Sequence, residues 1–156
     1  MEKKSVRQSQ VYTTQLVLPN DTNQLGNLLG GTMMHWIDIA AGIAAQRHSG
    51  YVCVTASVDE LNFHEPIRLG EIVTLQASVN RSFRTSMEVG VLVTASRLRE
   101  ASSRRANNAY LTFVAVDDQG HPTPVPQLVP ETEEEKRRYD EALMRRQFRL
   151  KRRGQA

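Results

Sequence analysis

The chain has 156 residues, of which 40% are hydrophobic and 24% charged, a composition that is ordinary for one globular domain. No apolar run approaches the roughly 20 residues that a membrane-spanning helix needs, and the start Met1–Ser5 leads into polar residues. We therefore expect neither a membrane protein nor a secreted one. The single cysteine, Cys53, excludes an intrachain disulfide and suits a reducing cytoplasm.

The net charge of +3 is distributed unevenly, because nine of the basic residues fall between residues 136 and 153. The commonest cause of such a run is a solvated helix face, which is the interpretation we put first. A phosphorylated small ligand would account for part of the charge equally well. Interleaved aromatic residues and zinc or RNA-binding signatures are missing, so we expect no nucleic-acid partner.

Apolar periodicity predicts the elements in chain order. Residues 11–18 read as a strand, and a Gly-rich loop then leads to a helix from about Gly31 to His48 that Gly50 closes. A Pro-rich connector, 122–130, precedes a charged helix. The remaining predicted elements are strands over about 52–63, 73–79, 87–95 and 108–116, a turn near 83–85, and a final helix over about 131–152.

The strand predicted over 52–63 changes phase along its length. Val52, Val54, Ala56 and Val58 share one face by simple alternation, whereas Leu61 and Phe63 fall on the other. Because a strand alternates strictly between its two faces, this change predicts a bulge near residues 59–60.

The element order is strand, long helix, four strands and tail helix. A sheet of that size must bury one face, and the helix 31–48, apolar on all sides, is the element able to fill it. We therefore expect an α+β protein with a single hotdog domain, in which an antiparallel five-stranded sheet wraps around a long central helix. The expected organisation is a flexible N-terminus (1–9), the hotdog domain (10–130) and a charged C-terminal helix and tail (131–156).

Two glycines, Gly30 and Gly31, stand at the start of the central helix. They allow close backbone approach and leave the unpaired amides of the helix N-terminus accessible, so these amides could stabilise an anionic oxygen. A plain tight entry into a buried helix explains the pair equally well. The glycine spacing fits neither a phosphate-binding P-loop nor a dinucleotide fingerprint.

Asp38 is the one carboxylate in the apolar helix, and a carboxylate there loses hydration and needs a partner. It lies seven residues beyond Gly31, about 10 Å along the axis, too far to act on a carbonyl held at its own helix start. If both serve one centre, they most simply come from two chains. The alternative is a buried carboxylate that only accepts hydrogen bonds; we favour catalysis.

Asn23, in the loop before the helix, is a third candidate. An asparagine there usually serves the turn, but its amide could also donate to a carbonyl oxygen or orient a water. The four histidines show no metal-ligand spacing, so we expect no metal. A serine-hydrolase elbow is missing as well.

At these residues the sequence resembles the cytosolic acyl-CoA thioesterases of the hotdog superfamily, over about residues 10–152. The matching stretches are residues 19–31 leading to Asp38, residues 54–59 with 62–63, residues 86–89 and residues 125–132. The resemblance implies hydrolysis of acyl-CoA to free acid and coenzyme A, without a further cofactor. It also implies that Asn23 and Asp38 form the catalytic pair across a dimer interface, in a dimer often assembled into a hexamer as a trimer of dimers.

In this hypothesis the Gly31 amide, helped by Asn23, polarises the thioester, and Asp38 acts as general base or as nucleophile. Coenzyme A is a polyanion and needs a basic rim. The predicted substrate-binding residues are Gly30, Phe63 as a wall beside Met33 and Trp36, and Arg81, Arg84, Thr85 and Ser86 near the turn between the long strands.

Two other functions remain open from the sequence. One is a non-catalytic hotdog module that binds or senses acyl-CoA. The presence of both catalytic-type residues, Asn23 and Asp38, counts against this alternative. The other is a hotdog dehydratase that uses a histidine with a carboxylate, for which His35 with Asp38 is the local pairing.

Overall fold

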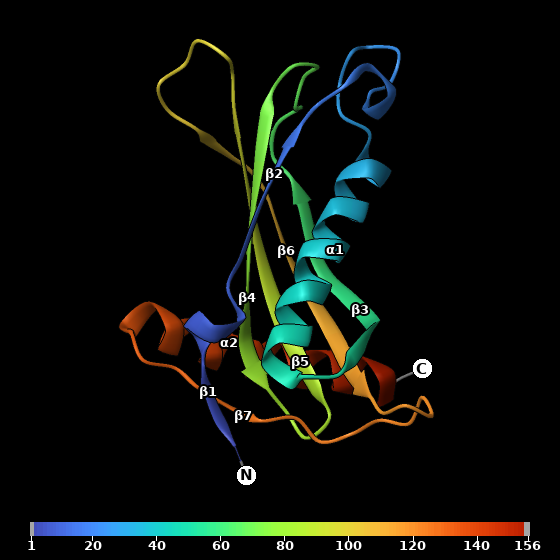
Figure 1. Ribbon diagram of the computed structural model, residues 1–156, viewed down its shortest axis with the longest axis vertical. Coiled ribbons are helices and arrows are strands. Elements are labelled where there is room, and N and C mark those ends of the chain that lie inside the picture. Colours follow the sequence, from blue (N-terminus) through green and yellow to red (C-terminus); the bar gives the residue numbers. More distant parts are fainter. Residues whose placement is uncertain (1, 155–156) are drawn as a thin grey trace.

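A long helix, α1 (Gly30–Ser49), lies against one face of a five-stranded antiparallel sheet in the computed structural model, which describes residues 2–154 (Figure 1). The strand order is β2-β4-β5-β6-β3, so β2 and β3 form the edges. This architecture confirms the predicted α+β class and the sheet wrapped around a helix. The strands are β2 (Val11–Leu16), β3 (Val52–Phe63), β4 (Ile72–Ser82), β5 (Ser86–Ser96) and β6 (Arg104–Val116).

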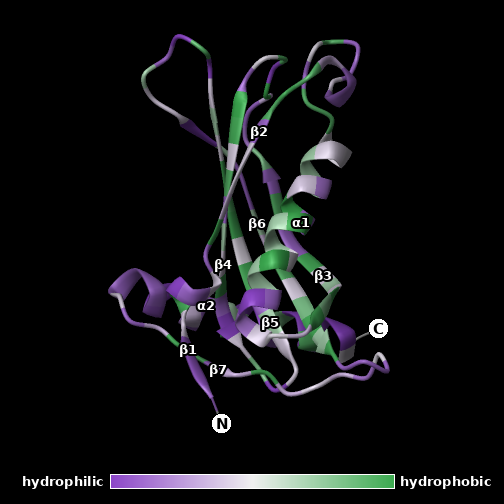
Figure 2. Cartoon of the chain, in the orientation of Figure 1, coloured by the Kyte–Doolittle hydropathy of each residue, from purple (hydrophilic) through white to green (hydrophobic). Residues whose placement is uncertain are grey.

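The core lies between α1 and the concave face of the sheet. The apolar residues of the two long central strands, β4 and β5, alternate in the way the sequence predicts and are buried. On the helix side four of the eight buried residues are alanines, which let the helix backbone approach the sheet closely. Gly42 is part of this approach, because a Cβ there would lie 3.6 Å from the Phe113 ring. Figure 2 shows the apolar residues gathered along this contact.

The opposite side of α1 is uncovered in the single chain. Ile39 is 48% exposed, His35 is exposed and Asp38 is half-buried. The sheet of one chain covers only one face of this helix, so its other face is open although the helix is apolar on all sides. A helix this apolar with one open side indicates a further packing partner.

Strand β3 is an edge strand with two register shifts, one between Thr55 and Ser57 and one between Val58 and Glu60. The second confirms the bulge predicted near residues 59–60. The first was not predicted, and it corrects the expected faces: Val58 pairs with buried Leu111 and so lies on the helix side, opposite to Val54. Each bulge adds one residue and so reverses the alternation that follows it.

Residues 3–9, within the stretch expected to form a flexible N-terminus (1–9), pack onto the domain. Strand β1 (Lys3–Ser5) pairs in parallel with β7 (Gln127–Val129), and the 3-10 helix η1 (Val6–Ser9) buries Val6 and Ser9. The Ser9 hydroxyl accepts a hydrogen bond from the Val79 amide at 2.9 Å. These contacts join the N-terminal segment to the end of the connector.

His48 fixes the connector to the end of α1. Its Nε2 donates to the carbonyl oxygen of Pro126 at 2.8 Å, and its side chain is fully buried. Burial lowers the pKa of the imidazole, so the ring stays neutral at pH 7. The histidine is thus a packed core residue.

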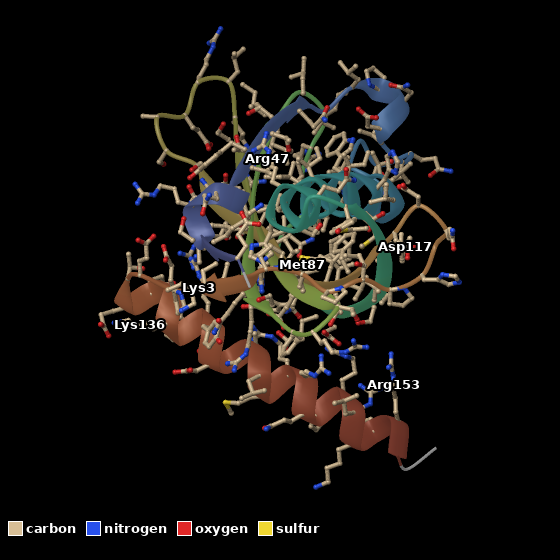
Figure 3. The ribbon with its side chains drawn as sticks, turned by 60° about the horizontal axis from the view of Figure 1, so that its bottom comes forward. Lys3, Arg47, Met87, Asp117, Lys136 and Arg153 are labelled. Carbon is tan, nitrogen blue, oxygen red and sulfur yellow. The ribbon has the colours of Figure 1, made fainter. Side chains whose placement is uncertain are left out.

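Helix α2 (Glu133–Gly154) crosses the face of the sheet opposite α1 (Figure 3). Arg145 donates to both carboxylate oxygens of buried Glu88, at 2.7 and 3.1 Å, and stacks on the Tyr110 ring. Arg149 donates to Asp59 at 2.6 Å. The interpretation of the basic run as a solvated face is therefore wrong for these two arginines, which fasten the helix to the sheet.

The loop between β3 and β4 is held by an ion pair between half-buried Arg104 and buried Glu71. Arg104 donates from Nη2 to Glu71 at 2.9 Å and to the carbonyl oxygen of Pro66 at 3.1 Å, while its Nε lies 3.0 Å from Glu65. Glu71 is buried and also accepts from the Arg68 amide at 2.7 Å. Hydrogen bonds from the Arg104 guanidinium hold the pKa of the Glu71 carboxyl below its usual range.

This pair predicts an acid-sensitive element of stability. Because the folded-state pKa of Glu71 is lowered, the stabilisation is present above the ordinary value of 4.5 and is lost as the pH falls through the folded-state value. We expect Glu71→Gln to reduce the free energy of unfolding by about 1–3 kcal/mol at pH 7 and to flatten its decline in acid. Urea titrations of the wild type and the variant, from pH 7 down to about 3, measure both effects.

The control is Glu133→Gln, at a side chain that is 94% exposed, which should follow the wild type throughout. If Glu71→Gln kept the wild-type pH dependence with no loss at pH 7, the ion pair would not contribute as described.

Candidate active site

The loop that leads into α1 is organised by its own polar side chains. After the 3-10 helix η2 (Pro19–Asp21), the Asn23 Oδ1 accepts hydrogen bonds from the amides of Leu25 at 2.9 Å and Asn27 at 3.2 Å. The turn therefore uses the oxygen of the Asn23 side chain, whereas the Asn23 Nδ2 has no hydrogen-bond partner among residues 2–154. This nitrogen is therefore free to donate a hydrogen bond to a ligand.

The start of α1 offers backbone donors. Leu29 is the N-cap residue and provides no side-chain cap, and the first helical hydrogen bond runs from the Met33 amide to the Leu29 carbonyl at 3.0 Å. The amides of Gly30 and Gly31 precede that bond, and both glycines are exposed. A Cβ on Gly31 would meet nothing within 4 Å, so an oxygen atom has room to approach. Helix N-termini favour negative charge at this point.

Asp38 is oriented by Thr55. The Thr55 hydroxyl on β3 donates to the Asp38 Oδ1 at 2.7 Å, which leaves the second carboxylate oxygen available. Both residues lie on the uncovered side of the chain, with exposed Ile39 beside them. Sequence reasoning missed Thr55, because the contact depends on the register of β3 beside the helix.

A cavity of about 240 Å³ opens beside the helix start. Phe63, at the end of β3, forms one wall and would lie 3.6 Å from a Cβ on Gly30. Of the predicted walls, Met33 and Phe63 line this cavity and Trp36 does not. The lining is completed by Leu28, His64, Glu65, Pro66, Ile67, Ala106 and Asn107.

A larger groove of about 580 Å³ lies on the other face of the sheet, between the strands and the start of α2. Its lining includes Gln76, Ser78, Arg105 and Arg137, and none of the candidate catalytic residues. We therefore place the site at the smaller cavity, where the helix start and an apolar wall meet.

The predicted coenzyme A rim lies at the other end of the molecule from Gly31 within one chain. The turn between β4 and β5 is beside the C-terminal end of α1 (Figure 1), and the Arg84 carbonyl accepts from the Val125 amide there. Arg84 is exposed. Arg81 instead has a structural contact, because its guanidinium stacks on Tyr139 at 3.8 Å and donates to the Tyr139 carbonyl at 3.1 Å.

Thr85 and Ser86, the other predicted rim residues, follow Arg84 at the end of this turn and the start of β5. Thr85 and Ser86 are half-buried, and the Ser86 hydroxyl lies 3.5 Å from the Arg146 guanidinium. One chain therefore does not bring these residues to the helix start.

Neither a metal nor a reactive thiol is indicated. Residues 2–154 contain no group of three His, Cys, Asp or Glu side chains that could hold a metal ion. Burial raises the pKa of the Cys53 thiol, which disfavours the thiolate a nucleophile needs. Across the described chain, no helix has the length and apolar character required to cross a membrane.

Comparison with known proteins identifies the family. Residues 25–102 match the family model described as Thioesterase superfamily. An acyl-CoA thioester hydrolase of Bacillus subtilis, itself uncharacterised, is 41% identical over 144 residues, which cover 92% of this chain and 84% of that protein. The chain belongs to the thioesterase superfamily. A human cytosolic acyl coenzyme A thioester hydrolase is 42% identical over 158 residues, which cover 99% of this chain and 42% of that protein. This thioesterase chain thus spans about two fifths of the length of the mammalian cytosolic acyl coenzyme A thioester hydrolases it matches.

Solved structures of the family have the same fold. A Staphylococcus aureus acyl-CoA hydrolase, in complex with butyryl coenzyme A and coenzyme A, superimposes with a TM-score of 0.92 at 40% identity, covering 98% of this chain and 93% of that one. An apo-hexameric acyl-CoA thioesterase gives 0.94 at 41% identity, covering 97% of each chain. The hotdog arrangement predicted for this thioesterase chain is confirmed.

Proposed function

We propose that the protein is an acyl-CoA thioesterase that hydrolyses acyl-CoA to a free carboxylic acid and coenzyme A. The observation that carries the proposal is the Asp38 carboxylate, held by Thr55 on an open face, in a chain whose helix start also presents free amides. The names of its relatives support this reaction class, since the bacterial and mammalian proteins are both called acyl-CoA thioester hydrolases. The name of the mammalian relatives also favours a cytosolic location.

The spacing of three residues supports their assignment as site residues. Structures exist of Staphylococcus aureus acyl-CoA hydrolase variants in which an asparagine, an aspartate 15 positions later and a threonine 17 positions after that are each replaced by alanine. Asn23, Asp38 and Thr55 have the same spacing, 38 − 23 = 15 and 55 − 38 = 17. We therefore assign Thr55 the role of positioning Asp38.

In the proposed reaction the thioester carbonyl oxygen accepts hydrogen bonds from the Gly31 amide and the Asn23 Nδ2. Asp38 removes a proton from a water whose oxygen attacks the carbonyl carbon, or its own oxygen attacks to give a mixed anhydride that water then hydrolyses. In both routes the carbon–sulfur bond breaks and the coenzyme A thiolate leaves. A thiolate is a good leaving group, so a strong acid is unnecessary.

The proposed site is shared between two subunits. Gly31 and Asp38 are separated by about 10 Å along one helix, so one carbonyl is better served by Gly31 of one chain and Asp38 of another. The edge strand β3 offers the contact, because its outer backbone edge has no partner strand among residues 2–154 and lies next to the open side of α1. Val52, Val54 and Val58 along this strand are exposed apolar residues. Antiparallel pairing of two β3 edges would oppose the helix start of each subunit to Asp38 of the other.

The same twofold pairing would also bring the predicted coenzyme A rim closer to the helix start. A dimer axis perpendicular to β3 turns the second chain end over end, so its β4–β5 turn approaches the level of the first chain's helix start. Arg84, with Thr85 and Ser86, then becomes a candidate for the coenzyme A phosphates from the second subunit. Hexameric structural neighbours favour a trimer of such dimers.

Thiol release from a panel of acyl-CoA thioesters, short to long, tests the proposed function. We expect turnover with at least one member of the panel, detected by a thiol-reactive dye, with one free acid formed per thiol. Binding of acyl-CoA without thiol release from any member would contradict the enzyme and favour the sensing module. A double bond formed in the acyl group, without thiol release, would instead indicate a dehydratase.

A further inference from the structure

Asn107 is a buried carboxamide without a partner. It is 1% exposed, and neither its Oδ1 nor its Nδ2 has a hydrogen-bond partner among residues 2–154. Buried polar groups in folded proteins are nearly always paired, and an unpaired one destabilises the fold. A residue that violates this rule in a functional domain is a candidate for contact with a ligand.

The surroundings of Asn107 are apolar. Its cross-strand neighbours are Val93 on β5 and Phe63 on β3, and residues paired in this way share one face of the sheet. That face is the one covered by α1, because the next residues of β6 on the same side, Ala109 and Leu111, belong to the core. Its two cross-strand neighbours on this face therefore offer the carboxamide neither an acceptor nor a donor.

Asn107 lines the cavity beside the helix start together with the helix residue Met33, and it also borders the larger groove. Met33 is only two residues beyond Gly31, about 3 Å along the helix axis. A carbonyl held by the Gly31 amide therefore directs a short acyl group into the cavity, and the rest of that group meets the Asn107 amide.

We propose that Asn107 determines acyl specificity, and that the cavity is a subsite for short acyl groups that carry a hydroxyl beyond the thioester carbonyl. The proposal rests on the proposed thioesterase function. A hydroxyl group on the acyl chain accepts a hydrogen bond from the Asn107 Nδ2 and donates one to the Asn107 Oδ1, so both ends of the amide are paired. A keto oxygen pairs only Nδ2, and a saturated chain pairs neither. The expected order of preference is hydroxyacyl, ketoacyl, saturated acyl.

The test compares kcat/KM for 3-hydroxybutyryl-, 4-hydroxybutyryl- and butyryl-CoA in the wild type and in Asn107→Leu. We expect the wild type to favour at least one hydroxyacyl thioester over butyryl-CoA by about tenfold or more. Asn107→Leu conserves volume and removes both unpaired groups, so it should unfold at the same or a higher temperature. The ratio of kcat/KM for the favoured hydroxyacyl-CoA to that for butyryl-CoA should fall to about one in this variant.

Asn108→Leu is the matched control. Asn108 is the next residue on β6, so strand alternation turns its side chain to the other face of the sheet. Its Oδ1 lies 3.2 Å from the His64 Nε2, so its amide already has a partner and the wild-type preference should persist. Asn107→Ala repeats the test with a smaller side chain and should also lose the preference.

The specificity role is overturned if the wild type hydrolyses hydroxyacyl-CoA and butyryl-CoA with similar kcat/KM, or if a preference for hydroxyacyl-CoA persists in both Asn107 variants. Neither result contradicts the proposed thioesterase function. A wild type that hydrolyses none of the three thioesters, nor any member of the wider panel, contradicts the proposed function itself.

Discussion

Replacing Asp38 by asparagine is expected to lower kcat for acyl-CoA hydrolysis by about 10²–10⁴-fold, because the side chain keeps its shape and loses the ability to take a proton or to attack. The Thr55 hydroxyl can still donate to the remaining amide oxygen, so the local structure should be retained. KM should change little, since the residue acts on the reacting atoms. Steady-state thiol release at saturating acyl-CoA measures the effect.

Controls for this prediction separate chemistry from folding. Asp140→Asn makes the same substitution at an exposed position of α2 and should leave kcat unchanged. Thr55→Val removes the donor to Asp38 and should lower kcat by about tenfold, whereas Thr55→Ser keeps the donor and should restore most of it. Full activity in a folded Asp38→Asn protein would overturn the mechanism and leave the reaction class untouched.

Two inactive variants are expected to restore each other when they are combined in one dimer. Asn23→Asp keeps the oxygen that holds the loop but removes the Nδ2 donor, and Asp38→Asn removes the base. If each site takes Asn23 from one subunit and Asp38 from the other, a mixed dimer contains one intact site. Random assortment after co-expression should then recover about one quarter of the wild-type kcat per subunit.

The outcome depends only on which chain supplies each residue. If both residues act within one chain, every site of the mixed dimer lacks one of them, and co-expression recovers nothing. Distinct tags on the two variants show that mixed dimers have formed. Each variant co-expressed with a differently tagged copy of itself should remain inactive and serves as the control.

Local patterns were sufficient for most of the fold. Strict alternation in β4 and β5 identified the buried side of each strand, and the helix from Gly30 to Ser49 begins and ends next to the glycines that marked its limits. The spacing between Gly31 and Asp38 was enough to propose a site shared by two chains, since the rise of a helix is fixed. These features depend on neighbours along the chain, so the sequence carries them directly.

Features that depend on distant contacts could not be predicted in this way. The unforeseen bulge after Thr55 sets which side chains of β3 face the helix, and so brings Thr55 to Asp38. Arg81 was expected to face a ligand and instead stacks on Tyr139 of α2, 58 residues away along the chain. Its charge alone could not distinguish a binding residue from a packing one.

The sequence by itself determined the order and nature of the two helices and the five strands of the main sheet, the apolar central helix and the separation of its two functional positions. Only the tertiary structure decided that one side of that helix is open, that the basic tail is fastened to Glu88, and that Asn107 is enclosed without a partner. The physical reason is that periodicity is local, whereas burial and hydrogen-bond pairing depend on strand register and on which segments meet across the fold.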